Sequence, residues 1–313
     1  LFNIKTDYPI STTSSSTGTT HTWTFTLTFV NLGTDQSDNE NASMDLEIYL
    51  QKTKILTLTD YVISQYTGTQ GENGLYYHDS SLANGAGDNS YRYAGASGSV
   101  NNYICLGSDA TTCPDANLFR IIGVFGDQTK VIRAKSVGDQ KWNTSKANAW
   151  SSSSLNTYLN GEYLTSLGTL ADKIATTTWK VGGWTYGNME TSVPKTAYQY
   201  EVGSSASTTT VDKKIGLMYV SDYGFAADQS GWTTKLSSYS SNTSKNWLYL
   251  GSYEWTISRD SNFANFAFYV DSDGYVYDNL VTNSFGVRPS FNLLSSVKYV
   301  SGSGSMSDPV RIN

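Results

Sequence analysis

The first fifty residues contain two stretches in which apolar and polar side chains alternate. Four large apolar residues alternate with threonines between positions 21 and 30, and residues 44–50 repeat the pattern. A period of two places one set of side chains on a single face of a strand. Two strands cannot bury such faces alone. We therefore expect a small β-rich N-terminal segment over residues 1–56, serving as a stalk, an anchor or part of a fibre, ahead of a larger domain over residues 57–313.

Helical and hairpin patterns follow. Residues 57–66 favour a short helix, with Thr59 as its cap and Val62 and Ile63 on its apolar side. Two apolar runs, residues 118–125 and 130–134, flank the sequence GDQT and predict the clearest β-hairpin of the chain. Apolar residues at helical spacing predict two helices, over residues 150–159 and 165–175.

The last third of the chain is predicted to be mainly strands. Residues 214–220 and 254–259 favour single strands. Residues 266–270 and 275–279 flank the turn sequence DSDG and predict a second hairpin, and residues 284–293 close the set. Most tryptophans in this part and before it are expected to fill the core with the indole N–H bonded, and stacking on sugars is the alternative.

Composition excludes several classes of partner. Charged residues are only 15%, but the chain has 23 Tyr and 8 Trp, and disordered chains have few aromatics. The net charge is −6 without a Lys/Arg cluster, which argues against nucleic acid or an anionic membrane surface as partner. No apolar run could span a bilayer, so we expect no direct membrane insertion. The chain begins at Leu1 without a leader, and we expect a trimmed product that is extracellular or at the cell surface.

The two cysteines, Cys105 and Cys113, are separated by a short polar loop. A disulfide that closes this loop is expected in an oxidising compartment. The alternative is a metal or redox pair, but two thiolates without a nearby histidine are too few ligands for zinc.

Chemical candidates are sparse. His78 is followed by Asp79, which could orient an imidazole, but no G-x-S-x-G sequence supplies a nucleophile. Asp271 and Asp273 precede Gly274, which suits a hairpin turn; the alternative is a structural calcium site, for which the full ligand pattern is missing. Glu201 and Glu254 are lone acids near aromatic residues. Glycoside hydrolysis needs two facing carboxylates, and the sequence does not show which acids face each other. We expect no enzyme, no catalytic residue, no metal ligand and no cofactor.

Residues 246–293 hold a dense mixture of Tyr, Phe, Asn, Asp and Ser between apolar anchors. Binding surfaces use this mixture, because Tyr and Phe give contact area at low entropic cost and Ser and Asn give adaptable hydrogen bonds. The segment has no obvious nucleophile or metal ligand. Its composition indicates recognition.

Several segments together resemble a known family. They are NLFRIIGVF, WSSSSLNTYLN, KIGLMYVSDYG, NWLYLGSYEWTISR, AFYVDSDGYV and GVRPSF. Over residues 117–313 the chain resembles bacterial surface proteins of the C-type lectin fold, and more narrowly the variable proteins of diversity-generating retroelements. The formylglycine-generating enzymes are more distant relatives of that fold. The resemblance implies an α+β, C-type-lectin-like head with two helices and a twisted antiparallel sheet.

The resemblance also implies which residues are displayed. Scaffold positions would include Trp255, Ile257 and Phe291. The ligand-binding set would be Arg259, Asp260, Asn262, Asn265, Tyr269, Asp271, Tyr275, Tyr277, Asp278, Asn279 and Asn283. In retroelement-diversified members such positions are hypervariable. The function implied is that of an adhesin-like or receptor-like binder of a protein or glycan on another cell or a host surface.

Two alternatives remain. The chain could be a pilus or fibre subunit with a decorating head, in which residues 1–10 add a strand to a neighbour and so support self-assembly. It could also be an enzyme on the formylglycine-generating fold. Those enzymes need reactive cysteines late in the fold, whereas Cys105 and Cys113 lie early, so we do not expect this activity.

Overall fold

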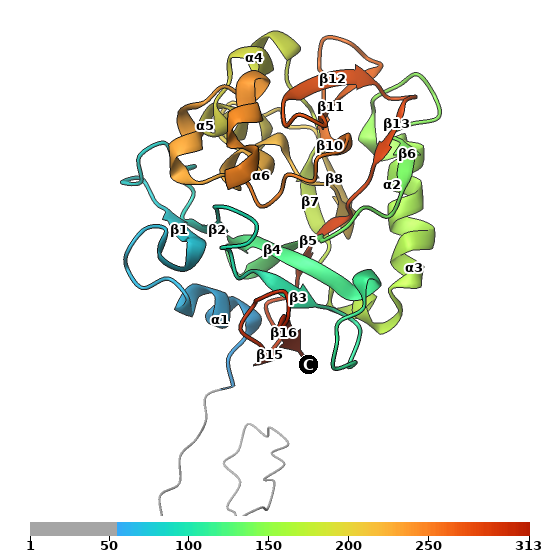
Figure 1. Ribbon diagram of the computed structural model, residues 1–313. Coiled ribbons are helices and arrows are strands. Elements are labelled where there is room, and N and C mark those ends of the chain that lie inside the picture. The colour runs from blue at the N-terminus through green and yellow to red at the C-terminus, as the bar shows by residue number, and fades with distance from the viewer. Residues whose placement is uncertain (1–54) are drawn as a thin grey trace, which may run out of the picture. The chain divides into compact units, whose positions relative to one another are not determined.

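The computed structural model describes residues 55–313, which belong to one compact unit. The two strands expected before residue 56, and the self-assembly strand expected at residues 1–10, lie outside the described residues. The described part combines three sheets with short helices, which is compatible with the expected α+β class (Figure 1).

The largest sheet has nine strands in the order β15-β16-β3-β4-β5-β14-β9, with β2 also pairing β4 and β1 pairing β2. Most neighbouring strands pair antiparallel. Two pairs run parallel: β16 with β3 in this sheet, and β10 with β13 in the five-stranded sheet. The strands of this sheet are β1 (Leu75–His78), β2 (Ser90–Tyr93), β3 (Tyr103–Cys105), β4 (Leu118–Phe125), β5 (Gln128–Arg133), β9 (Ile215–Gly216), β14 (Ser290–Leu293), β15 (Tyr299–Ser301) and β16 (Val310–Ile312).

The second sheet has five strands in the order β12-β11-β10-β13-β6, and a third contains only β7 and β8. In Figure 1 the five-stranded sheet lies at the end of the described part opposite the C-terminus and α1. The strands are β6 (Asp139–Lys141), β10 (Glu254–Arg259), β11 (Phe266–Val270), β12 (Val276–Leu280), β13 (Ser284–Gly286), β7 (Thr177–Lys180) and β8 (Thr210–Lys213).

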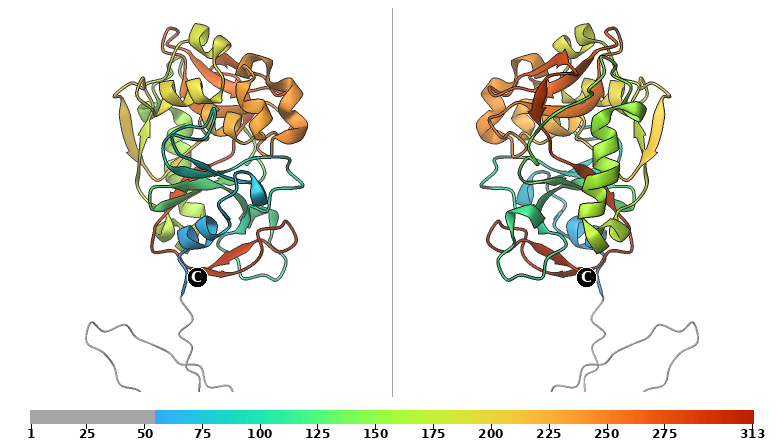
Figure 2. Two further views of the ribbon diagram at one scale, coloured as in Figure 1. Left: turned by 90° about the vertical axis from the view of Figure 1, so that its left-hand side faces the viewer. Right: turned by 90° about the vertical axis from the view of Figure 1, so that its right-hand side faces the viewer.

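The helices are short, and α6 is buried along its whole length. Figure 2 shows the run through α2 and α3 along one side of the molecule, and Figure 1 shows α4, α5 and α6 grouped on the other. The α-helices are α1 (Leu58–Ser64), α2 (Ser154–Tyr158), α3 (Leu164–Ser166), α4 (Tyr186–Thr191), α5 (Pro194–Glu201) and α6 (Val220–Phe225). Single-turn or 3₁₀ segments are Glu72–Gly74, Asp115–Asn117, Trp150–Ser152, Gly168–Lys173, Gln229–Thr233 and Leu236–Lys245, and Leu159–Tyr163 forms a π-helical turn. Within residues 55–313, no helix is both long and apolar enough to cross a bilayer.

The β4–β5 hairpin confirms the strongest prediction from the sequence. The second strand starts two residues earlier than expected, because Phe125 pairs with Gln128 and leaves a two-residue loop. Gly126 occupies the first loop position with φ +62°, a conformation that glycine adopts without strain. Glycine at this position is typical of the type II′ turn, whose twist matches that of the flanking strands.

Other expected elements needed correction. The cap of α1 is Thr57 and not Thr59: its hydroxyl accepts the Asp60 N–H at 3.0 Å, and the Asp60 carboxylate accepts the Thr57 N–H in return. The two helices expected over residues 150–159 and 165–175 are instead one helical run over residues 154–166, made of α2, the π-helical turn and α3, with a 3₁₀ segment on each side. The strand expected over residues 214–220 has only two residues, and the chain then turns into α6.

The closing segment was expected to be one strand, but it divides between two sheets. Residues 284–286 form β13 of the five-stranded sheet, and residues 290–293 form β14 of the nine-stranded sheet. Between them, Arg288 is buried and donates two hydrogen bonds to the Glu254 carboxylate, at 2.5 and 2.7 Å. This ion pair fixes the crossing point between the sheets.

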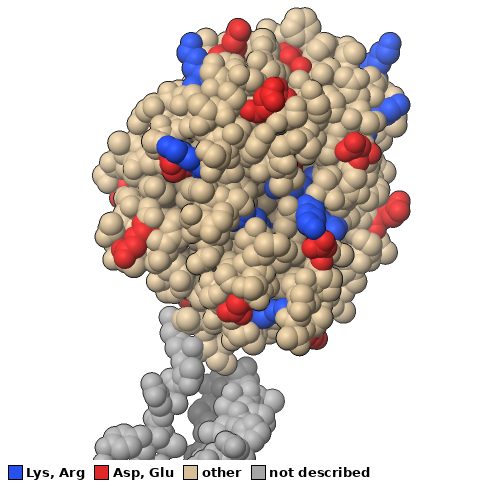
Figure 3. Space-filling model, viewed as in Figure 1, with Lys and Arg blue, Asp and Glu red and all other residues tan. Residues whose placement is uncertain are grey.

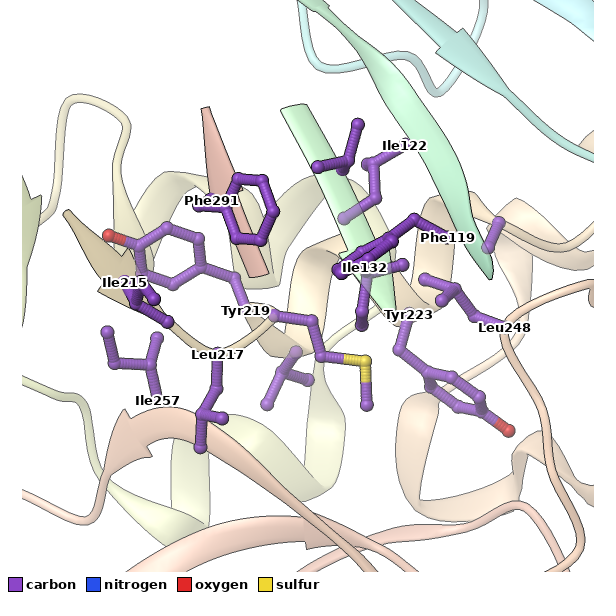
Figure 4. Close-up of a cluster of buried hydrophobic side chains, with 14 of the residues drawn as sticks. Phe119, Ile122, Ile132, Ile215, Leu217, Tyr219, Tyr223, Leu248, Ile257 and Phe291 are labelled. Atoms are coloured by element: carbon purple, nitrogen blue, oxygen red, sulfur yellow. The ribbon is translucent and has the colours of Figure 1, made fainter. Parts of the chain in front are cut away.

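Buried apolar side chains form one main cluster between the elements. Figure 4 shows a part of it, where Phe119, Ile132 and Phe291 of the nine-stranded sheet gather near Leu217 and Ile257. All seven tryptophans after residue 55 are buried, as expected. Five donate their indole N–H to a carbonyl oxygen, and two, at positions 150 and 184, have no acceptor among the described residues.

The disulfide prediction is confirmed: Cys105 and Cys113 are bonded, with their Cα atoms 5.8 Å apart. Arg311 of β16 holds the closed loop against the sheet, because its guanidinium donates to the carbonyl oxygens of Ser108 and Thr111.

Candidate ligand-binding face

Aromatic rings follow one another across four strands of the five-stranded sheet. Tyr269 of β11 lies directly opposite both Trp255 of β10 and Tyr277 of β12, so all three share one face of the sheet. Phe285 of β13 continues the row, with its ring centroid 4.5 Å from that of Trp255 and 4.8 Å from that of Tyr269. Tyr253, which precedes β10, stacks on Phe285 at 5.2 Å. We call these five residues the aromatic face.

The aromatic face has a buried layer and an outer layer. Trp255 and Tyr269 are buried, whereas Tyr277 and Phe285 are partly exposed and Tyr253 is 47% exposed. Tyr269 was expected among the displayed residues, and this expectation is wrong. Its ring supports the outer layer because two strands and two neighbouring rings enclose it.

The β11–β12 turn extends the outer layer with Tyr275, whose ring centroid lies 5.8 Å from that of Tyr277. The turn is built by Asp271, whose Oδ1 atom accepts the backbone N–H groups of Asp273 and Tyr275, both at 2.9 Å. This geometry supports the turn interpretation of the two acids over the calcium alternative. Within residues 55–313 no group of three or more His, Cys, Asp or Glu side chains is placed to hold a metal ion.

Two tyrosine hydroxyls fix the position of this turn. Tyr223 of α6 donates to the Gly274 carbonyl oxygen at 2.9 Å, and Tyr249 donates to the Ser272 carbonyl oxygen at 2.5 Å. Gly274 has φ +90°, and a Cβ atom there would lie 2.4 Å from the Thr243 methyl carbon. Glycine is therefore strongly favoured at this position of the turn.

In the β10–β11 loop the exposure of the side chains differs most from that expected for the ligand-binding set. Asp260 is fully buried and its Oδ1 atom accepts the Asn262 N–H at 2.7 Å, so its expected exposure is also wrong. The reason is that the loop folds over Asn148, which is buried and donates to the carbonyl oxygens of Asp260 and Phe263. Arg259 is partly exposed and donates to the Asn148 side chain at 3.1 Å.

The remaining expected residues reach the surface to different degrees. Asn262 is exposed, beside Phe263, which is 56% exposed. Asn279 is partly exposed and accepts the side-chain N–H of Asn283 at 2.8 Å, so these two amides pair with each other. The partly exposed members of the expected set are Arg259, Asn265, Asp271, Tyr275, Tyr277, Asp278, Asn279 and Asn283.

Asp278 and Asp260 form a carboxyl pair beneath the loop. The Oδ2 atom of Asp260 is buried and receives no donor from the other described residues. The Asp278 carboxyl group lies close enough to Asp260 to donate to it when Asp278 is protonated. Burial, followed by the hydrogen bond and charge of Asp260, raises the pKa of Asp278 to about 7. Burial and the charges of Glu190 and Asp278 also raise the pKa of the nearby Tyr186 on α4.

Sequence reasoning missed Tyr253, Phe285 and Asn148. Tyr253 could have been found, because it is two residues from Trp255 and a period of two places both on one face. Phe285 and Asn148 gave no such signal, because their roles depend on the pairing of β13 with distant strands and on a loop more than a hundred residues away.

The weighed catalytic candidates have structural partners. His78 is buried, and its Nδ1 atom accepts the Ala86 N–H at 3.1 Å; burial, and then the charge of Arg92, hold its pKa well below the ordinary value. The Asp79 carboxylate accepts from Ser81 and not from the imidazole. Glu201 is buried and accepts the backbone N–H groups at the start of α6.

Charge is scattered over the face shown in Figure 3. Lys, Arg, Asp and Glu side chains stand singly or in pairs among uncharged atoms, and no large area of one sign occurs in this view.

Comparison with known proteins gives one match. A protein-family model described as a domain of unknown function (DUF6273) matches residues 126–295, more than half of the chain. The match begins in the β4–β5 loop and contains the whole five-stranded sheet with its aromatic face. No curated protein matches the chain, and no solved structure matches it.

Proposed function

The chain belongs to the family described as a domain of unknown function, DUF6273, and from its geometry we propose that it is a ligand-binding protein of the cell surface or extracellular space. In this proposal it is an adhesin-like or receptor-like protein whose head has a C-type-lectin-like fold. The aromatic face is its binding surface. The observation that carries the proposal is the row of rings across four strands, with an outer layer held in place by a buried one.

Preorganisation supports this assignment. Tyr and Phe rings that are already packed lose little conformational freedom when a ligand covers them, so more of the contact energy remains as affinity. The turn beside the face is fixed by Tyr223 and Tyr249. Four of the eight exposed large hydrophobic side chains in the described part lie between residues 250 and 280, which concentrates apolar contact area near this sheet.

Location supports it as well. The described part begins at α1, and α1 and the C-terminus lie at the end opposite the five-stranded sheet (Figure 1). A head attached through residue 55 would thus hold the aromatic face away from its attachment. The disulfide between Cys105 and Cys113 suits an oxidising, extracellular compartment.

The proposed ligand is a protein or a glycan on another cell or a host surface. Binding, and not catalysis, is proposed because the titratable groups near the face are tied into the fold as turn, loop and cap partners. If the locus is diversified, as in the retroelement proteins that the sequence resembles, a template repeat and a reverse transcriptase gene should lie beside it in the DNA.

The test applies the labelled full chain to a glycan array and to a panel of intact bacterial and animal cells. Binding to at least one target is expected, and Tyr253→Ala with Tyr277→Ala should weaken it by about tenfold per ring, as for interface anchors. Val300→Ala is the matched control, because Val300 is exposed on β15 in the other sheet. Absence of any target, or equal binding by the double variant, would reject the aromatic face as the site.

A further inference from the structure

A cavity lies apart from the aromatic face and shares no residue with it. It has a volume of about 270 Å³ and is bounded by β2, β5, β7, α5 and the start of α6. This is just below the roughly 300–1,000 Å³ of pockets that hold drug-sized ligands. We call it the α6 pocket. Its lining includes the polar and charged residues Asp88, Arg92, Lys130, Tyr219, Asp222 and Asn292.

Four charged side chains meet in the α6 pocket in alternating order. The Lys130 ammonium lies 2.5 Å from the Asp222 carboxylate, and the Arg92 guanidinium lies 3.7 Å from the same carboxylate. On its other side Arg92 contacts Asp88 at 2.6 Å. Arg92, Lys130 and Asp222 are buried. Two cations and two anions therefore balance each other away from bulk water.

This balance disfavours a charged ligand. A carboxylate or phosphate would add a third anion beside Asp88 and Asp222, and the buried cluster would then carry an unbalanced negative charge. An ammonium ligand would leave a cation unpaired in the same way. Lys180, which also lines the pocket, is partly exposed and its charge is screened by water. A neutral ligand leaves every pair intact.

Hydrogen-bonding capacity nevertheless remains inside the pocket. Lys130 has three N–H donors and uses one on Asp222, and the Nη1 group of Arg92 donates to no acceptor within hydrogen-bond distance among residues 55–313. The Oδ1 atom of Asn292 is buried and receives no donor from those residues. Lys130, Arg92 and Asn292 all belong to the lining of the cavity, and a hydroxyl group can both accept from the two cations and donate to an amide oxygen.

Aromatic rings supply the rest of the wall. Tyr219 lies with its ring centroid 4.8 Å from the Lys130 ammonium, and Phe125 and Trp179 lie at 5.6 and 5.5 Å. Tyr198 lies 5.3 Å from the Arg92 guanidinium. Such walls offer apolar contact to the C–H surface of a ligand, while the ionic groups between them offer directed hydrogen bonds.

We propose that the α6 pocket binds a neutral, hydroxyl-rich small molecule, a single sugar ring or a cyclic polyol. Its hydroxyl groups accept from Lys130 and Arg92 and donate to Asn292, and its C–H face packs against the tyrosine and tryptophan walls. This site is independent of the aromatic face and goes beyond the proposed surface recognition.

The test titrates the full chain with D-glucose, D-galactose, D-mannose and myo-inositol, and with D-glucuronate and D-glucosamine as anionic and cationic counterparts. Saturation-transfer NMR and calorimetry follow binding up to about 50 mM ligand. At least one neutral probe should bind saturably, and at least tenfold more tightly than both charged counterparts. Absence of saturable binding by all four neutral probes, or tighter binding of a charged one, would overturn the proposal.

Two variants locate the site. Lys130→Met with Asp222→Asn removes the Lys130–Asp222 pair and the Arg92–Asp222 pair without changing the net charge. It keeps an acceptor for the Tyr219 N–H, which Asp222 now accepts at 2.8 Å. Its matched control is Lys135→Met with Asp115→Asn, an exposed ion pair outside the pocket. Binding of the neutral probe should fall more than tenfold in the first variant and stay unchanged in the control.

A further variant fills the pocket and tests the site even if the Lys130→Met, Asp222→Asn double variant does not fold. Val202→Trp places a large ring on a partly exposed lining position next to α5 and leaves all four charges in place. It should abolish binding of the neutral probe while the protein keeps its near-ultraviolet circular dichroism. Unchanged binding by a folded Val202→Trp protein would place the ligand elsewhere and refute the assignment.

Discussion

Replacement of Asp278 by Asn should make the protein more stable at neutral and alkaline pH. Asp278 of β12 shares a proton with the buried Asp260, and its pKa is raised to about 7. An asparagine keeps a donor for the Asp260 carboxylate and removes the repulsion between two ionised acids.

The direction in which stability changes with pH follows from the number of protons that the folded and unfolded states bind. An unfolded chain releases this proton near pH 4, whereas the folded protein keeps it until about pH 7. Between these values the folded state binds more protons, so the stability of the wild-type protein falls as pH rises. The contribution of Asp278 is fully present below about pH 4 and is lost as pH rises through about 7.

The magnitude follows from the size of the pKa change. A rise from 3.8 to about 7 corresponds to roughly 4 kcal/mol. Asp278 is only half-buried, and solvent screening reduces the expected effect to about 1–2 kcal/mol. Asp278→Asn should therefore exceed the wild type by about 1–2 kcal/mol at pH 8 and match it at pH 4.

Urea unfolding at half-unit intervals from pH 4 to pH 8 measures this difference. Asp172→Asn is the control, because Asp172 is exposed in the turn before β7. A stability difference that does not change with pH, or an asparagine variant less stable than the wild type at pH 8, would refute the shared-proton account.

Three further changes test interactions that stabilise the fold. Glu254→Gln should lower the free energy of unfolding by about 3–5 kcal/mol, because the Arg288 charge stays buried without its partner; urea unfolding measures this. Gly274→Ala should lower it by about 1–3 kcal/mol through backbone strain and the contact with Thr243, and near-ultraviolet circular dichroism should show altered tyrosine packing. Cys113→Ser should cost about 2–3 kcal/mol for a loop of this length, and a wild type that loses nothing on reduction would contradict it.

The sequence predicted correctly the elements whose apolar pattern and turn residues are adjacent in the chain. The hairpin of β4 and β5, strand β10 and the turn between β11 and β12 were found because each combines an apolar pattern with turn residues. The cap of α1 was misplaced by two residues, because threonines at positions 57 and 59 are both chemically suitable and only the backbone decides between them.

Features that depend on distant pairing could not be read from the sequence. The outer ring of Phe285 reaches the aromatic face only because β13 pairs with β10 and β6. Asp260 looked like a surface residue in a polar loop, but Asn148, far away in the chain, draws that loop inward. The charged groups of the α6 pocket come from positions 88 to 222, and no local pattern marks them as neighbours.

The crossing from β13 to β14 has a mechanical consequence. Only three residues connect strands that belong to different sheets, and the middle one is clamped by a buried carboxylate and by the Leu248 carbonyl oxygen. We therefore expect the five-stranded sheet to keep its orientation relative to the nine-stranded sheet when a ligand binds to it. Association should resemble the meeting of two rigid bodies, with side-chain rotations alone adjusting the fit.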